Sequence, residues 1–262
     1  SPADGAAGGL RKVGGTGGVT MNLAWIGVLL FGYGLGCALN YLADVLPIHR
    51  KFTAPVCTAC HEPLPWMQLF WPGICRGCQT RASVRTWIVL IGFPLAVLAL
   101  WLWTPPRLGF WMGSLLLAYF ALVAVTDLEY RIILHPVSLV GALGGFTLGW
   151  HLHGLNTTLI GGAAGFGIML VLYYFGELFA RFISKRRGQE VEEVALGFGD
   201  VNLSGVLGLI LGWPGITLGL LFGILLGGVT SAGIILVAVL RRKYQMFTAI
   251  PYAPFLILSA IF

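Results

Sequence analysis

The sequence predicts an all-α polytopic membrane protein, on the basis of its composition and of one repeated pattern. Of the 262 residues, 57% are hydrophobic and only 10% are charged, and the mean hydropathy is +0.87. Soluble globular proteins of this length do not have such a composition. The pattern is a series of long apolar runs separated by short polar segments, which predicts about 7–8 transmembrane helices. The 38 glycines fit closely packed membrane helices, where small residues let backbones approach.

The apolar runs define the expected helices in chain order. They lie at residues 22–46, 86–103, 110–127, 136–151, 158–182, 196–213, 216–240 and 251–262. The first seven are credible spans of a hydrocarbon layer about 30 Å thick. The last run would give roughly 18 Å of helix, so we expect either an incomplete span or a chain cut short.

We expect four regions along the chain. Residues 1–20 are rich in Gly and Ala without an apolar core, and they predict a disordered tail or an expression remnant. Residues 21–46 form a retained first transmembrane helix, because this segment is too long for the core of a signal peptide. Residues 47–85 form a small polar module, and residues 86–262 form the main transmembrane domain.

The basic residues orient the chain in the membrane. Successive loops lie on alternate sides of the membrane, counted from the end of the first span. One side collects Arg50, Lys51, Arg76, Arg81, Arg85, Arg131, Arg181, Lys185, Arg186, Arg187, Arg241, Arg242 and Lys243. Outside the N-terminal tail, the other side has Arg107 alone. Positive residues mark the cytoplasmic side, so the module at 47–85 is predicted to be cytoplasmic, and the net charge of +6 needs no nucleic-acid partner.

Four cysteines in the module predict a structural zinc site. They form two Cys-x-x-Cys pairs separated by 14 residues, namely Cys57, Cys60, Cys75 and Cys78. Two such pairs supply four thiolates for tetrahedral zinc. The predicted cytoplasmic location argues against disulfides, because thiols are kept reduced there. A module of about 40 residues with little core needs such a cross-link. A redox pair or free thiols remain the alternatives.

Two aspartates lie at the cytoplasmic ends of apolar runs. Asp127 ends the run at 110–127, and Asp200 lies about one turn inside the run at 196–213, behind Gly197 and Gly199. An ionisable group in a bilayer costs at least ~2.5 kcal/mol, so each acid is a candidate functional residue. The two glycines leave the backbone uncovered for close approach by another group.

Two converging carboxylates in a low-dielectric site share one proton and titrate as a unit. Such a pair can activate water for aspartic-protease chemistry. The same residues fit a proton-coupled transporter that uses Asp127 and Asp200 as a relay, and the chemistry alone does not choose between the two. A third hypothesis is an inactive scaffold that presents the zinc module to a partner.

The motifs around these acids resemble those of the type IV prepilin peptidases, which are Gly-x-Gly-Asp intramembrane aspartyl proteases. Residues 197–200 read Gly-Phe-Gly-Asp and are followed by Val201 and Leu203, and residues 126–129 read Thr-Asp-Leu-Glu. The paired cysteines after the first helix, and the closing segment at 250–256, are also similar to this family. The resemblance extends from Met21 to Phe262.

This resemblance implies that Asp127 and Asp200 are catalytic and that the four cysteines bind zinc. It implies a multi-pass protein of the bacterial inner membrane that removes the leader of a prepilin or pseudopilin at the cytoplasmic face, for a pilus or a secretion system. Many relatives then methylate the new N-terminus with S-adenosylmethionine, so this compound is a second candidate cofactor. The resemblance does not imply an oligomeric state.

Several departures from the family pattern lie around the first cytoplasmic loop. The end of the first helix keeps Gly36 and Asn40, but Val45 replaces an arginine of the family pattern. A glutamate common after the second cysteine pair is missing from residues 85–89, and Asn202 replaces a common lysine. None of these positions is an aspartate of the pair. We therefore expect peptide cleavage to be retained and methylation to be absent or weak.

Overall fold

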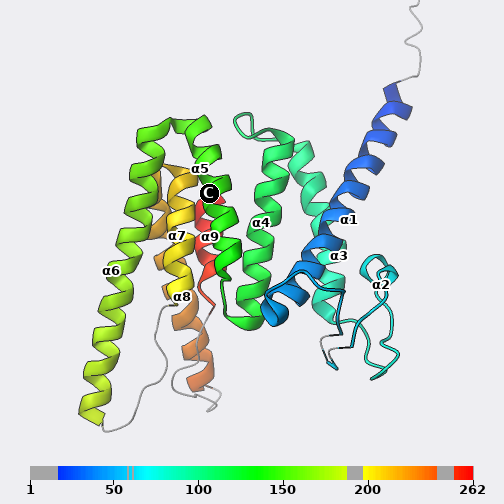
Figure 1. Cartoon of the computed structure of the whole chain (residues 1–262). Helices are drawn as coiled ribbons and strands as arrows, with labels where there is room; N and C mark the ends of the chain where they lie inside the picture. Colours follow the sequence, from blue (N-terminus) through cyan, green and yellow to red (C-terminus); the bar gives the residue numbers. More distant parts are fainter. Residues whose placement is uncertain (1–16, 58, 61, 188–196, 241–250, 262) are drawn as a thin grey trace, which may run out of the picture.

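The computed structural model describes residues 17–57, 59–60, 62–187, 197–240 and 251–261 (Figure 1). Its helices are α1 (Gly17–His49), α2 (Met67–Phe70), α3 (Val84–Leu102), α4 (Gly109–Tyr130), α5 (His135–His153), α6 (Leu155–Arg187), α7 (Phe198–Leu211), α8 (Gly215–Leu240) and α9 (Ala253–Ile261). The described part contains no strand beyond two isolated bridges, Val56 with Pro63 and Ile74 with Arg81. The all-α prediction is therefore confirmed.

Each of the eight apolar runs coincides with one helix, and α2 lies in the polar module between α1 and α3. Within the described residues, five helical segments are long and apolar enough to cross a membrane. They are Leu23–Ile48, Val84–Leu102, Gly109–Tyr130, Leu155–Phe182 and Gly215–Ile234. Helix α7 is a shorter apolar helix of 14 residues, and α9 has nine residues. The protein is thus a multi-pass membrane protein.

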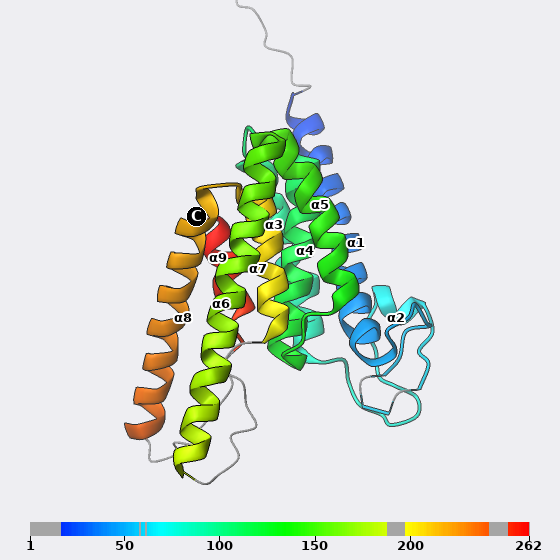
Figure 2. The ribbon, with the colours of Figure 1, turned by 60° about the vertical axis from the view of Figure 1, so that its left-hand side comes forward.

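The helices pack as two groups that meet at α4 and α9. Helices α1, α3 and α4 contact one another, while α7 is packed against α5, α6, α8 and α9. Helix α9 also contacts α4, and Figures 1 and 2 show this short red helix inside the bundle. The arrangement places the C-terminal end of α4 and the N-terminal end of α7 at the same end of the molecule (Figure 1).

Glycines allow a very close contact between α6 and α7. A Cβ atom added to Gly208 would lie 2.8 Å from the carbonyl carbon of Gly161 and 3.0 Å from the Cα of Gly162. The backbones of the two helices therefore touch directly, which larger residues would prevent. This contact fixes α7, the helix that carries Asp200, against the longer α6.

Candidate active site and metal centre

Asp127 lies in the last turn of α4 and is almost completely buried, with 6% of its surface exposed. Helix α4 ends three residues later, at Tyr130, because Arg131 adopts a left-handed conformation with φ of 53°. The side chain of Asp127 has a partner far away in the sequence. The backbone N–H of Ala253, at the start of α9, donates a hydrogen bond of 3.1 Å to its Oδ2 atom.

Asp200 lies in the first turn of α7 and is 8% exposed. Gly197 is the N-cap residue of this helix, and its backbone N–H donates a hydrogen bond of 3.2 Å to Oδ2 of Asp200. An acid in the first turn is also favoured by the partial positive charge at a helix N-terminus. Each aspartate therefore accepts a backbone N–H at the beginning of a helix.

The two acids are close enough to interact. The charge of Asp127 acts electrostatically on Asp200, and α9 contacts both of the helices that carry them. The structure thus brings together the two aspartates that the sequence analysis singled out. Two buried carboxyl groups at one end of the bundle can hold a water molecule and move its protons.

The two glycines before Asp200 have different surroundings. A Cβ atom on Gly199 would lie 2.9 Å from Cβ of Ile133, in the connection between α4 and α5. The nearest atom to a Cβ on Gly197 would be Oδ2 of Asp200, at 3.6 Å. The expected close approach therefore occurs at Gly199, whereas Gly197 contributes its N–H group.

The start of α9 has a role in the site that the sequence alone does not predict. Besides the bond from Ala253 to Asp127, the charge of Asp200 acts on the neighbouring Tyr252. The available signal was the closing segment at residues 250–256, which resembles the closing segment of the family named above. The sequence gives no indication of which other residues this segment contacts.

A second feature that sequence reasoning missed is a partly buried polar cluster around Arg85. This guanidinium forms ion pairs with Asp44 and, at 2.9 Å, with Glu129, and it donates a hydrogen bond of 3.0 Å to Asn40. Only 14% of the Arg85 side chain is exposed. The cluster joins α1, α3 and the last turn of α4, where Asp127 also lies.

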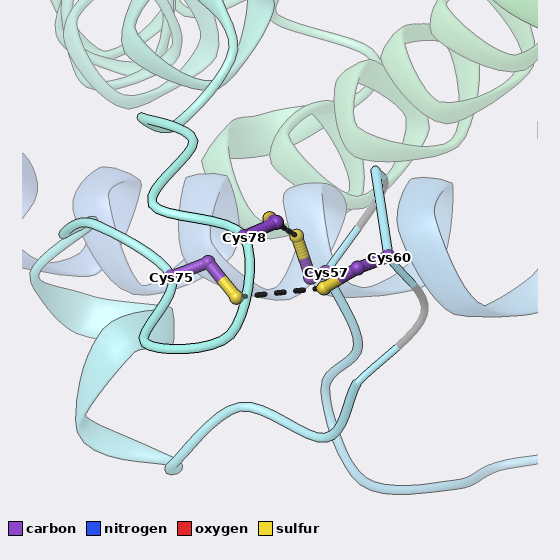
Figure 3. A group of neighbouring side chains, drawn as sticks. All are labelled: Cys57, Cys60, Cys75 and Cys78. Carbon is purple, nitrogen blue, oxygen red and sulfur yellow. Dashed lines mark hydrogen bonds between the residues drawn. The ribbon is translucent and has the colours of Figure 1, made fainter.

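The four predicted metal ligands come together in the module between α1 and α3 (Figure 3). Their Sγ atoms all lie within 4.8 Å of one another. The pairs Cys57–Cys78 and Cys60–Cys75 are each 3.6 Å apart, and none of the four forms a disulfide. Tetrahedral zinc with Zn–S bonds of about 2.3 Å requires sulfurs about 3.8 Å apart. The cluster therefore fits a metal of this size.

The local chain geometry brings the two cysteines of each pair close together. Each pair lies in a tight turn, closed by the bonds from Cys57 N–H to the Glu62 carbonyl (2.8 Å) and from Cys75 N–H to the Thr80 carbonyl (3.0 Å). Hydrogen bonds from the Thr80 hydroxyl and backbone lower the pKa of Cys78 to about 6. Metals bind the thiolate form, so this hydrogen bonding favours Cys78 as a ligand, whereas its hydrogen-bonded partner thiols raise the pKa of Cys60.

Fold and site define a polytopic all-α membrane protein with two buried aspartates at one end and a four-cysteine module. Comparison with known proteins gives a more specific class. Residues 114–232 match the type IV leader peptidase family. The chain is 30% identical over 216 residues to a prepilin leader peptidase/N-methyltransferase of Aeromonas salmonicida strain A449, covering 78% of this chain and 68% of the relative.

Other relatives with the same description agree. The protein from Aeromonas hydrophila is 29% identical over 233 residues, covering 82% of this chain and 72% of the relative. The one from Burkholderia pseudomallei strain 1026b is 27% identical over 255 residues, covering 91% of this chain and 74% of the relative. No solved structure matches the chain. The chain belongs to the type IV leader peptidase family and is a peptidase, and nothing in these comparisons supports the transporter alternative.

Proposed function

We propose that this protein removes the leader peptides of type IV prepilins or pseudopilins, with Asp127 and Asp200 as its catalytic pair. The observation that carries the proposal is the burial of two aspartates at the same end of the bundle, one in the last turn of α4 and one in the first turn of α7. Each of them accepts a hydrogen bond from a backbone N–H. The description of the relatives as prepilin leader peptidases supports the choice of substrate.

The proposed reaction needs one ionised and one protonated carboxyl group. The ionised acid takes a proton from a water molecule held between the pair, and the resulting hydroxide attacks the scissile carbonyl carbon. The protonated acid donates to the carbonyl oxygen. The peptide bond breaks when the leaving nitrogen receives a proton. Burial keeps competing water away from this site and strengthens each electrostatic interaction within it.

The test is co-expression with a candidate prepilin, followed by separation of the precursor and mature forms on a gel. We expect Asp127→Asn and Asp200→Asn each to abolish cleavage, since a loss of about 10⁴-fold or more is typical when an essential acid or base is removed. Glu177→Gln is the matched control, because this acid is paired with Arg181 on α6. Full cleavage by both asparagine variants contradicts the proposal.

We further propose that Cys57, Cys60, Cys75 and Cys78 bind one zinc ion. The sulfur spacing and the absence of disulfides among these four residues support it. Four sulfur ligands leave no open coordination position, so the zinc stabilises the module and takes no part in peptide cleavage.

The proposed location is the bacterial inner membrane, with the aspartates and the zinc module facing the cytoplasm. The asymmetric distribution of basic residues supports this orientation. The module around α2 also lies toward the end of the molecule where α4 ends and α7 begins (Figure 1). A prepilin leader would therefore meet both parts from the same compartment.

A further inference from the structure

The first residue of α9, Ala253, donates a hydrogen bond directly to Asp127, one acid of the candidate catalytic pair. Ala253 is fully buried, with 0% of its surface exposed, and its helix packs against α4, α7 and α8. Figure 1 shows α9 between α4 and α7, the helices that carry Asp127 and Asp200. The position of α9 therefore affects both acids.

The backbone N–H of Ala253 is available for this role because it lies at a helix N-terminus. The first N–H groups of a helix have no partner within the helix. In α9 this group donates to Oδ2 of Asp127 at 3.1 Å, within a buried environment. The positive end of the α9 dipole points toward the carboxyl group at the same time.

The segment before α9 lies beside the other acid. The charge of Asp200 acts on Tyr252, the residue that precedes Ala253. The ring of Tyr252 packs against α8, where a Cβ added to Gly227 would lie 3.2 Å from its Cδ2 atom. Ala253 therefore binds Asp127, while the preceding residue Tyr252 lies in the electrostatic field of Asp200 and packs against α8.

We infer that Ala253 is a positioning residue of the peptidase reaction, whose N–H holds Oδ2 of Asp127 and leaves Oδ1 for the attacking water. The inference rests on the proposed function, because it assigns a role relative to the pair Asp127 and Asp200. It makes α9 a third wall of the active site, next to α4 and α7. No side-chain atom of Ala253 is required, so conventional alanine scanning cannot detect this role.

The test replaces the backbone N–H alone. Nonsense suppression can incorporate lactic acid at position 253, which changes the amide to an ester and keeps the methyl group. We expect kcat for leader cleavage to fall roughly 10- to 100-fold, the usual effect of losing a hydrogen bond to a charged group. We expect KM to stay within about twofold, because the bond orients the acid and does not bind the substrate.

The matched control is the leucine analogue 2-hydroxy-4-methylpentanoic acid at position 258, in the same helix. The side chain of Leu258 is 44% exposed, and the residue lies more than a turn beyond Ala253. This ester removes an N–H from the interior of α9 and therefore weakens the helix at least as much as the ester at position 253, without changing the donor to Asp127. Equal losses of kcat in both esters would show a merely structural effect and would overturn the inference.

Ordinary mutagenesis gives a second test. Ala253→Pro removes the same N–H at the first position of a helix, where proline is tolerated, and Ala253→Gly keeps it. Loss of kcat in the proline variant but not in the glycine variant supports the inference, and wild-type kcat in the proline variant overturns it. Asp127→Asn is measured in parallel. If Asp127→Asn still cleaves the leader, the proposed function itself is contradicted. If Asp127→Asn is inactive but the ester variant at position 253 is fully active, only the role of Ala253 is contradicted.

Discussion

At the scale of single residues, the space around Gly199 sets the tightest steric limit on the candidate site. A methyl group there would lie 2.9 Å from Cβ of Ile133, closer than real Cβ contacts come. The β-branched side chain of Ile133 is stiff and cannot turn away easily. We expect Gly199→Ala to move the start of α7, displace Asp200 and lower leader cleavage about 10-fold or more, since a shift of about 1 Å can cost 10²-fold.

Gly197→Ala is the internal control for this prediction. Its backbone conformation (φ −79°, ψ 148°) is open to any residue, and the nearest atom to an added Cβ is 3.6 Å away. The N–H that binds Asp200 is also retained. We therefore expect cleavage rates within about threefold of the wild type, as for a sterically tolerated change. Equal damage by both substitutions would disprove the steric explanation.

The residues of the site differ in how far the sequence alone could identify them. Asp127 and Asp200 could be found because a charge in an apolar run is costly, and the cysteines could be found from their spacing. Ala253 could not be assigned a role, because its bond to Asp127 joins residues 126 positions apart. The ion pairs of Arg85 with Asp44 and Glu129 likewise depend on how three helices pack. No local pattern encodes such contacts.

At the scale of elements, the contact between α6 and α7 is a direct test of glycine packing. Gly208→Ala would press a methyl group against the backbone of Gly161 and Gly162. Overpacking of this kind typically costs about 1–3 kcal/mol. We expect a lower thermal unfolding midpoint in detergent and, because α7 carries Asp200, a parallel loss of cleavage.

Gly167→Ala is the comparison for that variant. It lies on the same helix, α6, but an added Cβ would have no heavy atom within 4 Å. Replacing glycine by alanine inside an unobstructed helix stabilises it by about 0.5–1 kcal/mol. We expect an unchanged or slightly raised unfolding midpoint. A fall equal to that of Gly208→Ala would show that the α6–α7 contact is not the cause.

The helices themselves were predictable from the sequence, but their ends were less so. All eight apolar runs form helices, because a chain in lipid must satisfy its backbone hydrogen bonds internally. Helix α1 continues to His49, past the expected end at residue 46, although Pro47 lies within it. Helix α6 extends to Arg187, beyond the apolar run that ends at residue 182. Hydropathy marks the part of a helix in lipid, and it does not mark the turns that project beyond it.

At the scale of the whole molecule, the zinc module and the transmembrane bundle depend on different interactions. The module has short hydrogen-bonded turns and few buried apolar residues, so a bound metal contributes much of its folding free energy. The bundle has its own core, formed by residues such as Val123, Leu203 and Leu256. The two parts should therefore lose structure separately.

We predict that Cys57→Ser or Cys75→Ser loosens the module first and leaves the helices intact. Metal analysis of protein purified without chelator should find about one zinc per chain, and little in the double variant. Proteolysis should then cut within residues 50–83, while helical circular dichroism remains near the wild-type level. Protein that contains no metal, or a double variant with unchanged protease resistance, would contradict the zinc assignment.

Methylation is the activity for which the whole molecule offers the least support, and we predict that it is absent or weak. Transfer from S-adenosylmethionine requires a cationic cofactor and a free N-terminal amine to be held together. Acidic and basic groups around the connection between α1 and α3 would serve this purpose, but this chain has the buried Val45 and the half-buried Val89 there. Asp44 is the nearest substitute acid, and its charge is already paired with Arg85.

The measurement is the mass of the mature N-terminus after reaction of a prepilin with the enzyme and S-adenosylmethionine. We expect complete removal of the leader and a product that carries little or no added methyl group, because cleavage requires only the aspartate pair and the groups that orient it. The relative from Aeromonas hydrophila, described as a prepilin leader peptidase/N-methyltransferase, is the positive control. The product of the Arg85→Lys variant is measured in the same way. A lysine at this position cannot make the three contacts of Arg85 with Asp44, Glu129 and Asn40 at once. A wild-type product one methyl group heavier at near-complete yield would show that the loop holds the cofactor despite these pairings.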